Sequence, residues 1–522
     1  MTFVITQNCC TDGSCVPVCP VDCIRPVPGS AATQMLYIDP DACVDCGACM
    51  AECPVGAIYH EDELPAGQIR FRDINAAYFD RTALTVREAV AKPTARAVER
   101  GALRVAIVGT GPAACYAASE VLRRAPGVQV NMFERLPTPF GLIRSGVAPD
   151  HQATKQIVSL FEPVLASDHL ACYLNVEVGR DITHAELTAH HDAVIYAVGA
   201  SRSRDLGIAG EQLPGHRAAA DFVAWYNGHP DHAGDDFGLA TSRVVIVGNG
   251  NVALDAARVL VAGADHLAQT DIAEHALKAL VASSVSEVVL LGRRGAAAAA
   301  FSVGELIALG ELAGVDVTVE GDVGERPDDD LDGALKYDLV VEYAARPTTP
   351  GNHRVVLKFS SPPLELVGTD RVEGLRIESG IIDTGLVLRS IGYRGAPIDG
   401  VPFDEELGWV PNEAGRVLDQ GEAVPGVYVA GWIKRGPRGV IGTNRTCAQE
   451  TVDNLMADLA GGRLNRTAAG DIGELLATRD VAAIDWQGWL SIDAAERARG
   501  DETSRPRVKF VNVDELVSAA LS

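Results

Sequence analysis

The fold is decided by the stretch Val105-Ala106-Ile107-Val108-Gly109-Thr110-Gly111-Pro112-Ala113-Ala114. An apolar strand meets a glycine turn that opens a helix, and Glu134 ends the next apolar strand. This is the G-x-G-x-x-A fingerprint in the context that it requires. The glycines let the backbone approach a pyrophosphate at a helix N-terminus, and the acid accepts hydrogen bonds from ribose hydroxyls. The predicted dinucleotide site consists of Gly109, Gly111, Ala113, Ala114 and Glu134.

A second fingerprint, Gly248-Asn249-Gly250-Asn251-Val252-Ala253, follows the apolar strand 243–247. The next predicted strand, 287–291, ends in Gly292-Arg293-Arg294 rather than in an acid. Arginines at this place suit a 2′-phosphate, because guanidinium matches the geometry of phosphate. The second site is therefore predicted to bind NADP(H) rather than NAD(H). Its predicted contacts are Asn249, Gly250, Asn251, Val252, Arg293 and Arg294.

Two fingerprints in a pattern of alternating strands and helices predict two doubly wound α/β domains. A flavin in the first domain and a nicotinamide in the second would allow hydride transfer, which no side chain can perform alone. Within the second domain, the stretches 337–343 and 354–359 suggest an antiparallel ribbon instead.

Nine of the twelve cysteines lie before residue 54, which in a chain without an export signal indicates metal. Cys43, Cys46, Cys49 and Cys53, followed by a proline, form the ligand run of bacterial ferredoxins, whose fourth cysteine serves the other cluster. Two-residue gaps aim three thiolates at one cluster. We expect Cys53 to start a helix and to point the opposite way.

The upstream half of this pattern is altered, because Asp12 stands where the middle cysteine would be, between Cys9 and Cys15, ahead of Cys19. By pseudo-symmetry, Cys19 joins the first three cysteines of the downstream run on one [4Fe–4S] cluster. Cys9, Cys15 and Cys53 then hold a second cluster, which is [3Fe–4S] or an Asp12-ligated [4Fe–4S]; we favour three irons, since carboxylate is the weaker ligand. Cys10 is an alternative to Cys9, and Cys23 is expected to be an unligated neighbour.

Composition limits the remaining possibilities. The 522 residues, 47% hydrophobic and 22% charged, indicate a globular protein of two or three domains. The chain has no long apolar run and begins without a basic, then apolar, leader, so we expect a soluble cytoplasmic protein. The formal net charge of −25 argues against nucleic-acid binding.

The charge is unevenly placed along the chain. Residues 1–75 carry three basic and ten acidic side chains, whereas residues 81–104 carry six basic and two acidic ones. This imbalance has two interpretations. Both stretches could be solvated surfaces, or an acidic redox module could be steered toward a basic docking surface.

From residue 104 onward the chain resembles adrenodoxin reductase-type ferredoxin–NADP+ reductases, which have the glutathione-reductase-like FAD/NAD(P) fold. The N-terminal segment is similar to seven-iron ferredoxins, so the whole resembles actinobacterial ferredoxin–reductase fusions. The reductase part of the resemblance covers about four-fifths of the chain. It is carried by residues 108–114, 139–144, 146–151, 250–255, 293–294, 389–395 and 430–444.

The resemblance implies a set of cofactor contacts. FAD contacts fall on Ala113, Glu134, Leu142, Val178 (by position only), Trp432, Gly439, Val440 and Ile441. NADP(H) contacts fall on Asn249, Gly250, Asn251, Val252, Arg293, Arg294, Glu305 and Gly439. Trp432 could instead be an ordinary buried indole.

The resemblance also places His151 and Glu305 near the nicotinamide, as candidate catalytic residues. His151 follows Asp150 at an apparent helix start, where the helix dipole favours a neutral imidazole, or where Asp150 is simply an N-cap beside a surface histidine. Glu305 lies three residues after Ser302, which is also the spacing of a capping box.

The expected organisation is a small α+β ferredoxin-type domain at 1–75 and an amphipathic helical linker at 76–103, interrupted at Pro93. Residues 104–202 form the first part of the FAD domain, 203–395 the NADP domain, and 396–522 the second part of the FAD domain with a C-terminal extension.

The expected activity is transfer of a hydride from NADPH to FAD and then of single electrons to the clusters or to an external ferredoxin. Because the ferredoxin segment is tethered to the reductase, the chain has one reason fewer to form an oligomer. We therefore expect a monomer. The external electron acceptor could be a ferredoxin or a cytochrome P450. The sequence does not distinguish between them, nor does it give the direction of electron flow.

Three other activities use similar motifs. A disulfide reductase of the thioredoxin-reductase type would need paired cysteines, whereas Cys115, Cys172 and Cys447 are isolated. The small subunit of glutamate synthase also combines iron–sulfur clusters with FAD and NADPH. A non-catalytic electron-storage module would need a damaged nucleotide site.

Overall fold

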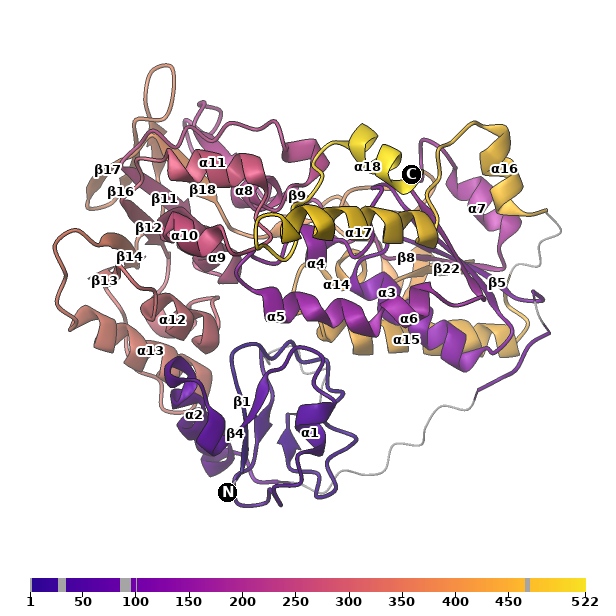
Figure 1. Ribbon diagram of the computed structural model, residues 1–522, viewed down its shortest axis with the longest axis horizontal. Coiled ribbons are helices and arrows are strands. Elements are labelled where there is room, and N and C mark those ends of the chain that lie inside the picture. The colour runs from indigo at the N-terminus through magenta and orange to yellow at the C-terminus, as the bar shows by residue number, and fades with distance from the viewer. Residues whose placement is uncertain (1, 27–33, 85–94, 100, 465–469) are drawn as a thin grey trace.

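The computed structural model describes residues 2–26, 34–84, 95–99, 101–464 and 470–522. Two nucleotide-domain-like α/β bodies lie side by side, and the N-terminal segment, indigo in Figure 1, lies beneath both of them. No helix among the described residues is long and apolar enough to cross a membrane.

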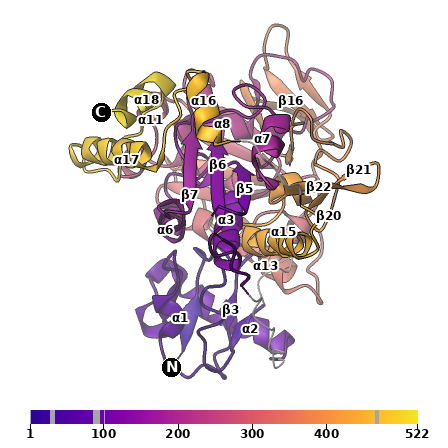
Figure 2. The ribbon, with the colours of Figure 1, turned by 90° about the vertical axis from the view of Figure 1, so that its right-hand side faces the viewer.

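The first α/β body is built on a seven-stranded sheet. In spatial order its strands are β20 (Asn412–Glu413), β21 (Arg416–Asp419), β22 (Glu422–Val429), β8 (Ala193–Tyr196), β5 (Arg104–Val108), β6 (Gln129–Glu134) and β7 (Leu170–Leu174). The five strands from β22 to β7 are parallel, and the central strands β5 and β8, rich in Val and Ile, are buried on both faces. Helices α3 (Pro112–Arg124) and α15 (Thr443–Ala460) pack together beside this sheet (Figure 2).

The second body has a six-stranded sheet in which every neighbouring pair is parallel. Its strands are β10 (His216–Ala218), β18 (Leu386–Arg389), β11 (Arg243–Val247), β12 (Glu287–Leu291), β14 (His353–Phe359) and β13 (Val315–Gly321). Its helices include α8 (Ala219–Tyr226), α9 (Asn251–Val261), α10 (Ala264–Leu267), α11 (Glu274–Val281), α12 (Val303–Gly310) and α13 (Leu331–Ala344).

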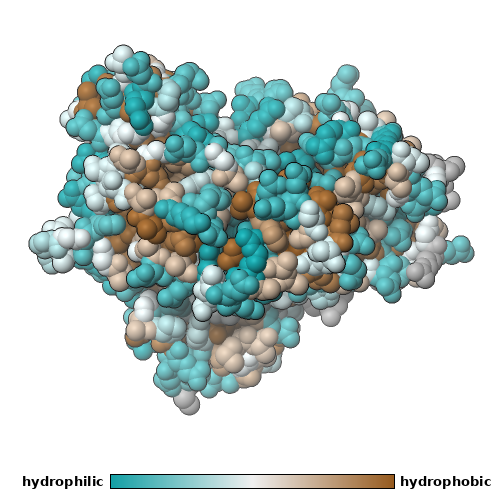
Figure 3. Space-filling view, turned by 45° about the horizontal axis from the view of Figure 1, so that its top comes forward, coloured by the Kyte–Doolittle hydropathy of each residue, from teal (hydrophilic) through white to brown (hydrophobic). Residues whose placement is uncertain are grey.

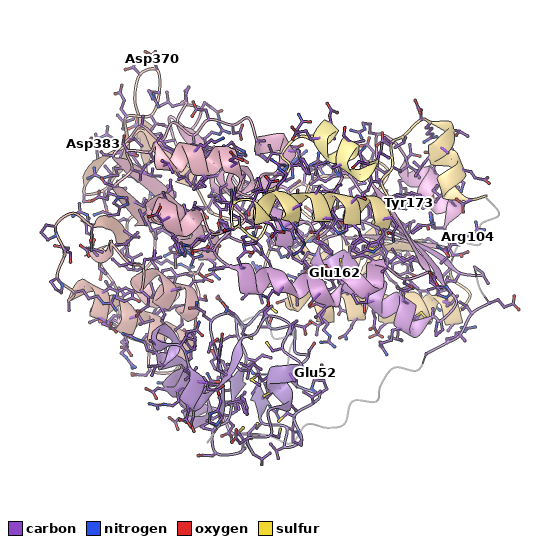
Figure 4. All side chains as sticks on the ribbon, in the orientation of Figure 1. Glu52, Arg104, Glu162, Tyr173, Asp370 and Asp383 are labelled. Carbon is purple, nitrogen blue, oxygen red and sulfur yellow. The ribbon has the colours of Figure 1, made fainter. Side chains whose placement is uncertain are left out.

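The ribbon predicted from residues 337–343 and 354–359 is wrong. Residues 337–343 lie within α13, where Leu339, Val340 and Tyr343 form one buried face at helical spacing. Residues 354–359 lie in β14, a parallel strand between β12 and β13. An antiparallel ribbon does exist further on, formed by β15 (Glu365–Val367), β16 (Gly374–Ile377) and β17 (Gly380–Asp383), and the labels Asp370 and Asp383 mark it in Figure 4.

The chain crosses between the two bodies twice, at neighbouring positions. β9 (Arg202–Ser203) leaves the first body, β19 (Tyr393–Arg394) returns to it, and the two strands pair in antiparallel fashion. The strands β20 to β22 then complete the first sheet, so the first body is assembled from two separate parts of the chain.

The described residues of the N-terminal segment form two small strand pairs, two α-helices and two single-turn 3-10 helices. β1 (Phe3–Ile5) pairs with β4 (Ile58–His60), and β2 (Ile24–Arg25) pairs with β3 (Tyr37–Ile38). The α-helices are α1 (Ala48–Ala51) and α2 (Arg70–Arg81).

Helix α2 crosses the boundary expected at residue 75. Its Asn75 accepts hydrogen bonds from the backbone N–H groups of Ile5 and Ile38, at 3.3 and 2.9 Å, so the helix is fastened to the N-terminal strands. Residues 82–84 and 95–99 are not helical, which contradicts a helical linker there, and Pro93 lies outside the described residues.

The described residues of the N-terminal segment form no hydrophobic core of their own. Its buried residues Phe3, Ile24 and Phe71 belong to one continuous cluster with residues of the second body such as Leu306 and Tyr343. At its other side Cys10, Val55 and Ala57 join the core of the first body. The segment has few aliphatic residues of its own. Packing against both larger bodies therefore supplies the buried apolar surface that it lacks.

The C-terminal extension fastens the two larger bodies to each other. It contains α16 (Ile472–Thr478), α17 (Trp486–Asp501) and α18 (Val513–Ala520). Glu496 on α17 is fully buried and accepts two hydrogen bonds from Arg144, at 2.9 and 2.5 Å. Beyond α17, Lys509 pairs with Asp271 of the second body at 2.9 Å.

We expect Glu496→Gln to lower the free energy of unfolding by about 3–5 kcal/mol, because it leaves the buried Arg144 without its counter-charge. Equilibrium urea unfolding at pH 7 measures this difference. The exposed Glu502→Gln serves as the matched control and should change stability by less than about 0.5 kcal/mol. A Glu496→Gln protein as stable as the control would contradict the buried ion pair.

The same ion pair predicts a pH dependence. Burial acts to raise the pKa of Glu496, but Arg144 and Arg507 outweigh it and hold this pKa below its usual value. A carboxyl with a lowered folded-state pKa stabilises the fold above its unfolded pKa, about 4.3, and loses that contribution as the pH falls through the folded value. The stabilities of the wild type and Glu496→Gln should therefore converge in acid unfolding experiments below about pH 4.

Candidate nucleotide and iron–sulfur sites

The first fingerprint lies at the carboxyl end of β5, where the chain turns into α3. Gly109 has φ +103°, and a Cβ there would lie 2.6 Å from the carbonyl oxygen of Ala197, so only glycine fits. At Gly111, the N-cap of α3, a Cβ would meet nothing within 4 Å, which leaves room in front of the helix N-terminus. A pyrophosphate fits this arrangement of free N–H groups and open space.

The other residues expected at this site have distinct surroundings. Glu134, at the end of β6, accepts hydrogen bonds from the backbone N–H and hydroxyl of Thr110, at 3.1 and 2.7 Å. Ala114 is completely buried, and Ala113 lies against Gly431, which begins the 431–444 segment. Val178 follows Val176, whose N–H donates to the carbonyl of Glu134 at 2.8 Å.

Apolar residues are exposed around both fingerprints. Leu142, Val198 and Ile391 are 49%, 39% and 39% exposed, although each adjoins a glycine turn of one of the two sites. Apolar patches also reach the surface in the middle of the face shown in Figure 3. Trp432 is only half-buried and stacks on Tyr393, with ring centroids 5.9 Å apart, so it is not an ordinary core indole. A flat, largely apolar ring system suits such surroundings.

The second fingerprint repeats the geometry of the first at the end of β11. Gly250 caps α9, and Asn251 accepts a hydrogen bond from the N–H of Ser302 at 2.7 Å, which holds the start of α12. Arg293 and Arg294 are exposed, and neither side chain forms a hydrogen bond or an ion pair with the described residues. Two free guanidinium groups beyond β12 fit a phosphate ligand.

A buried charge cluster lies between the two bodies, centred on Arg258 of α9. Its guanidinium is 2.7 Å from Asp150, 2.7 Å from Asp255 and 2.9 Å from Glu305. Its Nη2 also lies 2.6 Å from Nε2 of His151. Asp150 and His151 precede α5 (Gln152–Lys155) in the first body, whereas the other three residues belong to the second.

The charges of this cluster are mutually compensated. Burial lowers the pKa of Arg258, but the three carboxylates outweigh it and raise that pKa, so the guanidinium stays charged. Burial raises the pKa of Asp255, against the effect of Arg258. Because arginine can only donate hydrogen bonds, Nε2 of His151 must be the acceptor, and the ring proton resides on Nδ1.

His151, Asp255 and Glu305 could in principle hold a metal ion, since one ligand atom of each lies within 4.8 Å of the others. Arg258, however, already pairs with both carboxylates and the imidazole. The positive charge in this cluster is therefore supplied by the protein itself.

Cys19, Cys43, Cys46 and Cys49 line one apolar cavity in the N-terminal segment. Burial raises the pKa of Cys49 to about 12, and the charges of Cys43 and Cys19 add to this, so a thiolate at Cys49 requires a positively charged partner. Cys46 is exposed, and Cys23 also lines the cavity, with its sulfur 3.4 Å from that of Cys19. In Figure 4 the label Glu52 marks the residue that follows the short helix containing Cys49.

Cys9, Cys15 and Cys53 form a second group on the side of the first body. Burial raises the pKa of Cys9 to about 11, and burial together with the charges of Cys9 and Cys53 raises that of Cys15 further. Cys53 follows α1 instead of starting a helix, so that expectation is wrong: the short helix contains Cys49 and ends at Ala51. Cys10 is packed in the core of the first body.

Comparisons with known proteins agree with these sites. A family model described as "Pyridine nucleotide-disulphide oxidoreductase" matches residues 103–295, and one described as "4Fe-4S binding domain" matches residues 36–59. The "Probable ferredoxin/ferredoxin--NADP reductase" of Mycobacterium tuberculosis is 49% identical over 551 residues, covering 100% of this chain and 95% of that protein. The chain belongs to the ferredoxin/ferredoxin–NADP reductase family.

Further members of this group match the part of the chain after the N-terminal segment. "NADPH-ferredoxin reductase FprA" of Mycobacterium tuberculosis is 42% identical, covering 80% of this chain and 99% of that protein. The solved structure "Mycobacterium tuberculosis FprA in complex with NADPH" matches with a TM-score of 0.75 at 40% identity, over 80% of this chain and 100% of that one. The expected fold, family and oxidoreductase class are thereby confirmed.

Sequence reasoning missed Arg258, which this structure places at the centre of the cluster containing His151 and Glu305. A signal existed: Arg258 lies three residues after Asp255 on a helix that otherwise buries alanine, valine and leucine. A cation on such a face needs buried anionic partners. The Ser302 cap was expected correctly, because its hydroxyl accepts from the N–H of Glu305 at 3.2 Å, while the Glu305 carboxylate turns to Arg258.

We expect Gly248→Ala and Gly250→Ala to fail in different ways. A Cβ at Gly248, with φ +124°, would lie 2.1 Å from the carbonyl oxygen of Ser390, so this variant should lose more than about 2 kcal/mol of stability. A Cβ at Gly250 comes no closer than 3.8 Å to any atom, so this variant should fold normally yet bind NADP+ at least about tenfold more weakly. Urea unfolding and NADP+ difference spectroscopy measure the two effects. Unchanged NADP+ affinity in Gly250→Ala would remove the second fingerprint as the binding site.

Proposed function

We propose that FAD binds at the first fingerprint, that NADP(H) binds at the second, and that the chain is a ferredoxin–NADP reductase with its own iron–sulfur relay. The observation that carries this proposal is the meeting of the two fingerprint-bearing bodies across the Arg258 cluster, beside a segment with two groups of cysteines. When bound, FAD accepts the hydride of NADPH as two electrons and a proton, and it passes the electrons on one at a time.

In this proposal residues 104–202 and 396–522 form the flavin domain, and residues 203–395 form the NADP(H) domain. The return of the chain through β19 to strands of the first sheet supports this division. Gly109, Gly111, Ala113, Ala114, Glu134, Leu142 and Val178 contribute to the flavin site from the first part, and Trp432, Gly439, Val440 and Ile441 from the second.

For NADP(H) we propose Asn249, Gly250, Asn251 and Val252 at the pyrophosphate, and Arg293 and Arg294 at the 2′-phosphate. His151 and Glu305 are proposed to position the nicotinamide rather than to exchange protons. The contact of Arg258 with Nε2 of His151 supports a neutral imidazole with its proton on Nδ1.

For the clusters we propose that Cys19, Cys43, Cys46 and Cys49 hold a [4Fe–4S] cluster. Cys9, Cys15 and Cys53 hold the second, which is [3Fe–4S] or a [4Fe–4S] cluster with Asp12 as a ligand. The second group adjoins the flavin domain and the first is open to solvent at Cys46, which favours a relay in this order.

The proposed external acceptor is a redox protein, such as a ferredoxin or a cytochrome P450, that approaches the solvent-facing cluster. Residues 26–69 contain seven acidic side chains and no lysine or arginine, so a basic partner surface would be attracted. We propose that the reductase acts as a cytoplasmic monomer, because the relay is already part of the chain.

An anaerobic titration with NADPH and then NADH, followed by visible absorption and EPR, tests this proposal. NADPH should bleach the flavin at far lower concentration than NADH and should change the iron–sulfur EPR signal. Absence of flavin and iron after anaerobic reconstitution would refute it.

Replacing both Arg293 and Arg294 by alanine should raise KM for NADPH by about ten- to a hundredfold and leave KM for NADH nearly unchanged, because only NADPH carries the 2′-phosphate. Steady-state reduction of ferricyanide measures both constants. Arg326→Ala, an exposed arginine elsewhere in the NADP(H) domain, is the control. An equal loss with both coenzymes would contradict the assigned role.

A further inference from the structure

Asp12 stands at the position where the upstream cysteine run lacks a cysteine, and its carboxylate is turned to the reductase. Its Oδ2 accepts a hydrogen bond of 2.6 Å from the hydroxyl of Tyr116. Its Oδ1 accepts from the N–H of Ser14 at 3.0 Å and from the Ser14 hydroxyl, and lies 3.5 Å from Arg445. Asp12 is only 4% exposed, so this carboxylate depends on protein donors rather than on solvent.

The two reductase residues come from helices that also shape the first fingerprint site. Tyr116 lies in the second turn of α3, whose N-terminus carries Gly111. Arg445 lies in the first turn of α15, directly after the 439–441 segment, and also donates to the Asp12 carbonyl at 3.0 Å. The contact thus links the cysteine-bearing loop to the proposed flavin site through two helices: α3, which carries Tyr116, and α15, which carries Arg445.

Backbone packing at the same place shows a fitted interface. The N–H of Gly442 donates to the carbonyl of Cys10 at 2.8 Å. A Cβ at Gly442 would lie 2.2 Å from the carbonyl carbon of Thr11, so no other residue fits there. The loop bearing Cys9, Cys10 and Asp12 therefore lies in direct backbone contact with the start of α15.

The hydrogen-bond capacity of the carboxylate is largely used. A carboxylate has about four acceptor positions. Oδ1 of Asp12 accepts from the N–H and the hydroxyl of Ser14 and lies 3.5 Å from Arg445, and Oδ2 accepts from the hydroxyl of Tyr116. An iron ion bound at Oδ1 would have to displace the Ser14 donors, and one bound at Oδ2 would share that oxygen with the hydroxyl of Tyr116. Burying a carboxylate without them would cost free energy.

We propose that Asp12 is a docking residue that anchors the ferredoxin segment to the flavin domain, and not an iron ligand. The exchange of cysteine for aspartate replaces a fourth cluster ligand by an anchor, so that Cys9, Cys15 and Cys53 hold a three-iron cluster fixed beside the flavin domain. This inference rests on the cluster assignment proposed above, but the anchor itself is defined by protein atoms alone.

The test uses the full-length holoenzyme with Asp12→Asn, Tyr116→Phe and Arg445→Met. Docking is followed by hydrogen–deuterium exchange of peptides that contain Gly442, whose amide is bonded across the interface. Cluster type is followed by iron and sulfide content and by EPR of the oxidised protein. Stopped-flow absorption separates flavin reduction by NADPH from the later electron transfer to the clusters.

All three variants should keep the iron content and the oxidised EPR signal of the wild type. Exchange near Gly442 should become about tenfold to a hundredfold faster, as expected for loss of one hydrogen bond to a buried charge. Transfer from flavin to cluster should slow, while flavin reduction by NADPH stays unchanged. Tyr173→Phe, the same substitution at the distant position labelled in Figure 4, and Arg497→Met are the matched controls.

A change of iron content or EPR signal in Asp12→Asn, together with wild-type exchange near Gly442 in Tyr116→Phe, would overturn the proposal and make Asp12 a ligand. Failure of NADPH to reduce the flavin in the wild type would refute the proposed function instead, and would leave the exchange result standing.

Discussion

The ion pairs of Arg258 are the constraint on which the relation between the two nucleotide domains depends. One guanidinium, 2% exposed, is shared by carboxylates that the chain brings from both domains. Neither domain could bury its part of this cluster alone, because unpaired buried charges are far more costly than paired ones. The cluster therefore favours one arrangement, in which His151 and Glu305 meet. The C-terminal extension reinforces this arrangement at a second place, where its Glu496 pairs with Arg144 and its Lys509 pairs with Asp271.

The ferredoxin segment depends on the same arrangement, because it packs against both domains. Its aliphatic residues are continuous with the core of the second body, and its Asp12 loop touches the first body. The charge pattern of the sequence suggested an acidic module at 1–75 steered toward a basic surface at 81–104, but half of the basic residues of that stretch lie outside the described residues. The Asp12–Arg445 contact pairs an acidic residue of the segment with a basic one of the first body. The pair of Arg70 with Glu342, at 2.7 Å, has the opposite sign. Complementary shape and burial, more than net charge, hold the segment.

Local features of the sequence were predicted well, and long-range ones were not. The strand–glycine–helix turns at Gly109 and Gly248 are encoded within about ten residues, so their pattern could be recognised directly. The apolar run around Leu339 and Val340 fits a strand or a buried helix equally well, and here the helix α13 was misread. The partners of Asp12 and Arg258 lie 47 to 433 residues away, apart from Asp255 and Ser14. No local pattern in a single sequence reveals such contacts.

The interface between Asp12 and Arg445 also bears on how the protein is made. The two residues are separated by 433 positions, so the cysteine-rich loop leaves the ribosome long before the helix that covers it. At common rates of synthesis, about 5–20 residues per second, the interval is roughly 20–90 s. During this time the loop that bears Cys10 lacks the surface of the first body against which it is later packed. Correct maturation thus requires a reducing environment and protection of the nascent chain until its last fifth has been translated.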